Sequence, residues 1–153
     1  VDATGGKVTL TSREIELQGD IRSFRTMGGT TYRGTLTLQP LSARAPIGVA
    51  FPASPFRFDL TSTELDHILD GFDDGEDQRY LVDGEVIIVE GSDGITIGRE
   101  NGRHQFVIGT YTFRDSVTFR APVLGGQFDI IGTISTSESD TDSDGVEIKF
   151  DGP

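Results

Sequence analysis

Four short segments decide the fold of this 153-residue chain: Ile95-Thr96-Ile97, Phe106-Val107-Ile108, Val117-Thr118-Phe119 and Phe128-Asp129-Ile130. Each places apolar residues two positions apart, which is the spacing of side chains on one face of a β-strand. Their starts are evenly spaced, and taking them in pairs gives a repeat of about 22 residues, a length typical of stacked structural units. Two short strands per repeat fit one coil of a β-helix.

The same alternation occurs outside this region, and its occurrences extend the repeat. The starts at 15, 36 and 58 keep nearly the same interval, whereas the interval from 58 to 95 is longer and predicts an insertion. We therefore predict an all-β fold, a parallel β-helix-like solenoid, as a single module over residues 1–153. An antiparallel β-sandwich is the alternative, because its strands are also short and closely spaced. The further triplets are Val8-Thr9-Leu10, Ile15-Glu16-Leu17, Leu36-Thr37-Leu38, Phe58-Asp59-Leu60 and Val146-Glu147-Ile148.

One segment has a helical pattern. Thr61 and Glu64 have the spacing of a capping box, in which each residue's side chain bonds the other's backbone. The apolar residues that follow recur at three and four positions, which predicts a short helix over residues 62–70. These residues are Leu65, Ile68, Leu69 and Phe72.

The insertion, at about residues 71–91, contains a hairpin signal. Asp83-Gly84 separates two apolar runs, 79–82 and 85–89, and this dipeptide favours a tight two-residue turn. We predict a β-hairpin that leaves the body and packs on the body or on a partner. Its packing face is predicted to carry Tyr80, Val82, Val86 and Ile88 or their neighbours. Residues 40–55 contain four prolines, which predicts an irregular crossing with a short edge strand near residues 49–51.

Composition excludes several classes of function. The chain has 13 Lys and Arg against 25 Asp and Glu, a formal charge of −12, which argues against nucleic acid and anionic membranes as partners. No apolar run approaches the ~20 residues of a membrane span, so we predict no membrane insertion. The absence of cysteine excludes disulfides and thiolate chemistry.

The acidic loop at residues 137–145 is the best candidate for a metal site. Asp140, Asp142 and Asp144 alternate along it and Gly145 follows, while Asp151 stands where an EF-hand has its twelfth-position acid. Residues 146–150 have a strand pattern instead of a helical one, so a calcium loop of another kind is predicted. The predicted ligands to Ca²⁺ are Asp140, Asp142, Asp144 and Asp151, and the alternative is a solvated turn or a flexible linker.

The sequence offers little for catalysis. The two histidines, His67 and His104, lie far apart along the chain, and no nucleophile or phosphate-binding motif is present. Asp115 near Arg114 and Arg120 resembles the acid and base groups of polysaccharide-active β-helices, but an acidic chain supplies such neighbours by chance. We therefore predict that the protein is not an enzyme.

Most of the chain resembles a known group of repeats. Ile95-Thr96-Ile97-Gly98-Arg99-Glu100-Asn101-Gly102 and Ile130-Ile131-Gly132-Thr133-Ile134 resemble units of giant secreted bacterial β-solenoid proteins. These are the filamentous-haemagglutinin-like and cyanobacterial β-strand-repeat surface proteins. The resemblance implies a right-handed parallel β-helix, an extracellular location on the bacterial cell surface and a structural or adhesive role, without catalytic residues. The hairpin, the proline-rich segment and the acidic loop depart from it.

The expected partners are neighbouring copies or modules of the same protein, because a solenoid that ends without a cap exposes unpaired strand edges. We predict a module of a surface rod, filament or adhesin. The first alternative is a calcium-dependent adhesion or carbohydrate-binding module that recognises surface polysaccharide, and the second is a polysaccharide-active enzyme. The predicted interface residues are Val8, Leu10, Val146, Ile148 and Phe150 in the first and last strands, with Tyr80 and Ile88 in the hairpin.

Overall fold

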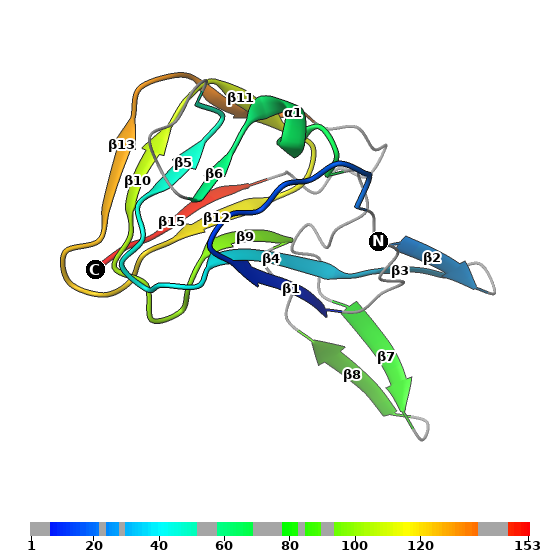
Figure 1. Cartoon of the computed structure of the whole chain (residues 1–153). Helices are drawn as coiled ribbons and strands as arrows, with labels where there is room; N and C mark the ends of the chain where they lie inside the picture. The colour runs from blue at the N-terminus through cyan, green and yellow to red at the C-terminus, as the bar shows by residue number, and fades with distance from the viewer. Residues whose placement is uncertain are drawn as a thin grey trace.

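The computed structural model describes residues 7–21, 24–27, 30–51, 58–68, 78–82, 85–89, 94–137 and 147–153, and it is predominantly β (Figure 1). Two parallel sheets form its body. The five-stranded sheet has, in spatial order, β1 (Lys7–Ser12), β4 (Thr35–Pro40), β9 (Ile95–Gly98), β12 (Val117–Arg120) and β15 (Ile148–Asp151). The four-stranded sheet has β13 (Gln127–Ile130), β10 (Gln105–Ile108), β5 (Ile47–Val49) and β6 (Phe58–Leu60). A third parallel ladder joins β11 (Tyr111–Phe113) to β14 (Ile134–Thr136).

The sequence repeat predicts the strand pairing of residues 94–130 in the correct register. Ile95 pairs with Val117 and Phe106 pairs with Phe128, and both ladders are parallel. The chain passes through the three ladders in the order β9, β10, β11 and then repeats that order as β12, β13, β14. The all-β fold with parallel sheets is confirmed, and antiparallel pairing as in a sandwich is not what joins these strands.

The core lies between the sheets and is formed by alternate residues of each strand. In β4, Leu36 and Leu38 are fully buried, whereas Thr35, Thr37 and Gln39, which alternate with them, are partly exposed. Phe119 is fully buried and its ring meets those of Phe106 and Phe113 edge to face, with centroids 5.8 and 5.9 Å apart. Such ring pairs add to the stabilisation that burial provides.

Longer connections interrupt the repeat elsewhere. Val8 pairs with Leu36 and Leu36 pairs with Ile95, so each of these connections within the five-stranded sheet is longer than one repeat. The first contains an antiparallel hairpin of β2 (Phe24–Met27) and β3 (Thr30–Arg33), which the sequence analysis did not predict. The second contains the predicted hairpin, β7 (Gln78–Val82) and β8 (Glu85–Val89), in which Val82 pairs with Glu85.

Three expectations for the first half of the chain are wrong. Residues 15–17 form no strand, although Ile15 is buried. Phe58 does not continue the ladder of Leu36, because β6 belongs to the other sheet and pairs with β5. β5 spans Ile47–Val49 and is an internal strand between β10 and β6 instead of an edge strand. It can be internal because the prolines flank it and none interrupts its backbone donors.

The predicted helix is shorter than its apolar pattern suggests. α1 (Ser62–Leu65) begins with the predicted capping box, in which the Glu64 backbone N–H donates to Thr61 Oγ1 and the Thr61 N–H donates to Glu64 Oε2. It ends early because Ile68 joins Ile21 in a parallel bridge, with the Ile21 N–H donating to the His67 carbonyl at 2.8 Å. Among the described residues, no helix has the length and apolar character needed to cross a membrane.

Candidate interaction surface

The two edge strands of the four-stranded sheet differ sharply in exposure. Along one register, Phe58, Ile47, Phe106 and Phe128 are neighbours from β6 to β13. Along the next, Leu60, Val49, Ile108 and Ile130 are neighbours. Phe58 and Leu60 are fully buried in β6, whereas Phe128 is half-buried and Ile130 is 47% exposed in β13. One edge of the sheet is therefore covered and the other is not.

Residues 13–21 contribute apolar side chains to the core near that edge, where Leu17 is partly buried. Ile15 is part of the buried core, and Ile21 bridges to Ile68 just beyond α1. Burial, then Glu64 and then Glu14 raise the pKa of Asp59, the middle residue of β6. In Figure 1 the dark blue trace that follows β1 runs past β6 toward α1. We call β6 together with residues 13–21 the closed end.

The opposite end is formed by β13, β14 and β15, and we call it the open end. Two pairs of rings stack toward it: Phe106 on Phe128 at 5.2 Å and Phe119 on Phe150 at 5.4 Å between centroids. The two outer rings, Phe128 and Phe150, meet edge to face at 5.3 Å. Phe150 is 43% exposed, although Phe119, its neighbour in the ladder, is fully buried.

Other large apolar side chains are exposed in β13, directly after it and in the connection that leads to it. Large exposed apolar groups close together are typical of surfaces that bind another protein. The sequence analysis predicted only Phe150 among them as an interface residue. The others could have been found from their position in the last complete repeat, because the last repeat has no further repeat to cover it. The exposed residues are Val123, Leu124, Ile130, Ile131 and Phe150.

The predicted interface residues fall into three groups. Val8 and Leu10 lie in β1, and Ile148 and Phe150 lie in β15, so the four residues are on the two edge strands of the five-stranded sheet. Val146 lies outside the described residues.

The hairpin residues Tyr80 and Ile88 belong to different cross-strand pairs. Tyr80 pairs with Ile87 and Ile88 pairs with Arg79. Directly opposed residues share a face and alternate along the ladder, so Tyr80 and Ile88 stand on opposite faces. The register therefore separates Tyr80 and Val82 from Val86 and Ile88, and the residue that shares a face with Tyr80 is Ile87, a neighbour of the predicted ones.

The calcium prediction stays a prediction. Asp140, Asp142 and Asp144 lie outside the described residues. Asp151 ends β15, and its Oδ2 accepts a hydrogen bond from Arg120 Nε at 2.9 Å. Within the described part of the chain, no group of three His, Asp or Glu residues is arranged to hold a metal.

The two histidines have different surroundings. His67 is partly exposed and its Nδ1 lies 3.0 Å from Asp20 Oδ1. His104 is fully buried, and its Nδ1 lies 2.9 Å from the Ala45 carbonyl oxygen. Burial lowers the pKa of His104, with a smaller lowering from Arg99, so the ring is neutral and Nδ1 donates to Ala45.

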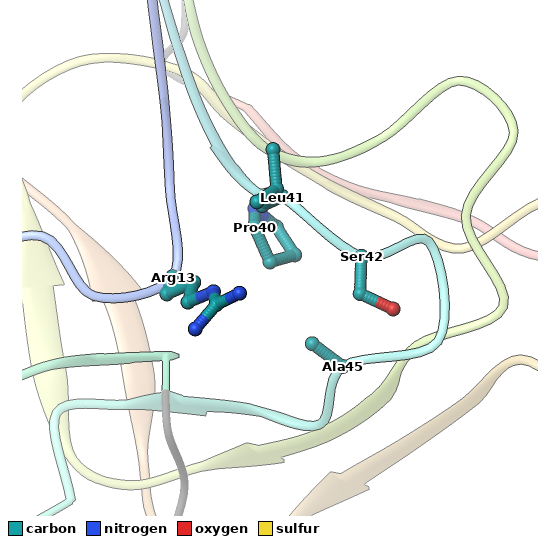
Figure 2. Close-up of a pocket in the computed structure, with 5 residues that line it drawn as sticks. All are labelled: Arg13, Pro40, Leu41, Ser42 and Ala45. Atoms are coloured by element: carbon teal, nitrogen blue, oxygen red, sulfur yellow. The ribbon is translucent and has the colours of Figure 1, made fainter.

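The described residues line at least two hollows. The first, about 340 Å³, is lined by Arg13, Pro40, Leu41, Ser42 and Ala45. Figure 2 shows the Arg13 guanidinium directed toward the space between Pro40 and Ala45. The second, about 540 Å³, is lined by Ala50, Phe51, Thr61, Ser62, Thr63, Gly109, Thr110, Ile131 and Gly132. Neither contains a buried charged group that would select a ligand, so the open end is the better candidate for function.

Comparison of the chain with protein-family models, with curated proteins and with solved structures finds no match.

Proposed function

We propose that this chain is a right-handed β-solenoid module of a rod or filament on the bacterial cell surface. A coil is one passage through the three ladders. Its structural role is to stack with neighbouring modules, so that ladder hydrogen bonds and the apolar core continue from one unit to the next. The extracellular location follows from the resemblance of its repeats to those of giant secreted surface proteins.

The observation that supports this proposal best is the repetition of β9, β10 and β11 as β12, β13 and β14, in which each strand pairs in parallel with its counterpart one coil later. The third ladder extends in the other direction through local contacts. The Tyr111 hydroxyl donates to Asp66 Oδ1 at 3.0 Å, and Ile68 bridges to Ile21. A unit whose strands recur at a nearly constant offset is suited to extension along one axis.

The surroundings of the titratable residues also favour a structural role over catalysis. His104 is bonded within the core and His67 is paired with Asp20. Asp115, which the sequence placed near arginines, is buried at 5% exposure. None of these three groups is presented in either hollow.

The test uses a tandem protein in which a second copy follows Pro153 directly, measured by small-angle X-ray scattering beside the single chain. A rod module predicts that the maximum dimension roughly doubles while the cross-sectional radius of gyration stays constant. A tandem whose cross-section widens, or whose copies tumble independently, would contradict the proposal. Surface labelling of the parent cells with an antibody tests the location.

A further inference from the structure

We propose that the module accepts a neighbour only at its open end, and that the occupant is an extended segment that adds as a parallel strand beside β13. The occupant has the pattern of Gln127–Ile130, with large apolar residues at the second and fourth positions. This inference rests on the proposed function, because it names the direction of stacking and the partner that stacking requires.

The first argument is the unequal height of the ladders at the open end. β15 lies beyond β12 in the five-stranded sheet, whereas β13 ends the four-stranded sheet and β14 ends the third ladder. A parallel strand placed beside β13 would stand level with β15. It would cover Phe128, Ile130 and Ile131, which are exposed or only half-buried at this edge.

The second argument is the register of the chain after β15. Arg120 pairs with Asp151, so Pro122 and Pro153 occupy equivalent positions, each two residues beyond its paired strand residue. After Pro122, four residues connect to β13, which begins at Gln127. A segment that follows Pro153 with the same spacing would therefore arrive beside β13 in the same register as β13 beside β10.

The third argument is the chemistry of the position beside β13. The apolar columns of the four-stranded sheet continue without interruption from β6 to β13, and each interior member is buried by its neighbours on both sides. An edge strand adds affinity through its free backbone groups, and alternate side chains add specificity. An occupant with polar residues at those two positions would bury them against Phe128 and Ile130 without partners.

The closed end offers no equivalent position. β6 occupies the last place in the four-stranded sheet, yet Phe58 and Leu60 are fully buried, and Ile15 and Ile21 from residues 13–21 belong to the same buried core. Among the described strands of the five-stranded sheet, β1 is the edge at this end, and its Val8 and Leu10 are already half-buried. A strand added at this end would have no exposed apolar column in the four-stranded sheet to cover.

The test extends the full chain by one passage. The segment 123–137 is duplicated after Pro153, and a control of identical composition exchanges each apolar residue of its Gln-Phe-Asp-Ile stretch with the preceding polar one. We expect the first extension to raise the melting temperature by roughly 5 °C or more and to suppress binding of an apolar dye. The control reverses which residues face the core, so it should melt as the unextended chain does.

Four results bear on the inference and on the proposed function. Equal melting of the extended and control proteins would overturn the inference, and so would equal stabilisation by the same segment placed before Val1. Stabilisation by the C-terminal extension alone, with new amide-exchange protection in β13, would support it. Failure of the tandem protein to form a rod while the extension still stabilises would remove the proposed function and leave the strand site.

Discussion

The strands β6 and β13 are the two edges of one sheet, and they are built from the same kinds of residue. Each carries a phenylalanine and a large aliphatic residue on the inward positions of the same registers. Phe58 and Leu60 are fully buried, whereas Phe128 is half-buried and Ile130 is 47% exposed. The difference does not come from side-chain type. It comes from the surroundings of each strand: Phe58 and Leu60 lie in the buried core together with Ile15 and Ile21, whereas Phe128 only packs against that core and Ile130 is outside it.

The largest expected effect is on the closed edge. Phe58→Ala should lower the free energy of unfolding by about 3–5 kcal/mol, because it leaves a cavity in a fully buried site. Phe128→Ala, the matched change at the open edge, should cost about 1–2 kcal/mol, because its ring already contacts solvent on one side. Urea unfolding of both variants measures the two values. Equal losses would show that the two ends are equally covered.

The second prediction compares two glycines, Gly98 at the end of β9 and Gly19 in residues 13–21. Gly98 has φ of 112°, and a Cβ atom there would collide with the Arg120 carbonyl oxygen of the next strand. Gly98→Ala should therefore destabilise the protein by about 2–3 kcal/mol. Gly19→Ala should change stability by less than about 0.5 kcal/mol, since nothing lies within 4 Å of its Cβ position.

Thermal melting of the two glycine variants is the measurement. A large loss of stability in Gly19→Ala would contradict the open space around the Cβ position of Gly19. A small loss in Gly98→Ala would mean that the coils can separate at this position, which would weaken the case for rigid stacking.

How much of this structure could be predicted from the sequence depended on the length of the connections. The pairs Ile95–Val117 and Phe106–Phe128 were predictable because the connections there keep one constant length. Between Leu36 and Ile95 the same alternation does not predict which strands pair, because a segment with a strand pattern can join either sheet. The pairing of β6 with β5 depends on tertiary packing, which cannot be predicted from sequence periodicity.

The candidate surface was only partly predictable for a related reason. Phe150 belongs to the last strand, so its place at an edge followed from chain order. Ile130 and Ile131 match the pattern of buried residues. They are exposed because β13 is the edge strand of its sheet, and the sequence pattern does not show which strand is the edge. The place of residues 13–21 in the closed end was also unpredicted, because Ile15-Glu16-Leu17 has the alternation of a strand and forms none.

The third prediction concerns calcium at the predicted acidic loop, which precedes β15 in the sequence. With Kd in the 10⁻⁴–10⁻³ M range of extracellular modules, about 5 mM calcium should stabilise the protein by about 1–2 kcal/mol over EDTA. Asp142→Ala should abolish the shift. Arg120→Gln should enlarge it if Asp151 is a ligand, because Asp151 is then released from the 2.9 Å bond to Arg120 Nε.

Melting temperatures in EDTA and in calcium provide these comparisons, with magnesium as the control ion. An unchanged melting temperature in the wild type would eliminate the site. A shift that survives in Asp142→Ala would place the ion elsewhere. A shift that is identical in Arg120→Gln would remove Asp151 from the ligand set while leaving Asp140 and Asp144 in it.

The smallest effect on stability is expected from a change of pH, through protonation of the buried His104. Its Nδ1 donates to Ala45 in the connection before β5, and its own carbonyl accepts from the Gln127 N–H of β13. Its Nε2 is buried without a hydrogen-bond partner in the described part of the chain. Protonation would therefore place a charged N–H in an apolar site, which is why burial lowers the pKa of this histidine.

The sign of the pH dependence follows from that lowered pKa. Above the ordinary histidine pKa of about 6.5, His104 is neutral in both the folded and the unfolded chain, and it adds no pH dependence. As the pH falls below about 6.5, the unfolded chain takes up the proton and the folded chain does not, so stability falls by at most about 1.4 kcal/mol per pH unit. The loss continues until the pH reaches the pKa of the folded state.

Urea unfolding at pH 7.5 and 5.5 measures this loss above the range in which most carboxylates titrate. His104→Gln should remove the histidine part of the difference, whereas His67→Gln, at the partly exposed histidine beside Asp20, should retain it. Amide exchange at pH 5.5 should increase in β13 before it increases in β6, because the Gln127 N–H of β13 is bonded to the His104 carbonyl and Ile130 of β13 is exposed, whereas Phe58 and Leu60 of β6 are fully buried. Equal increases in the two strands would mean that protonation loosens the whole sheet, and the contrast between its edges would not extend to their dynamics.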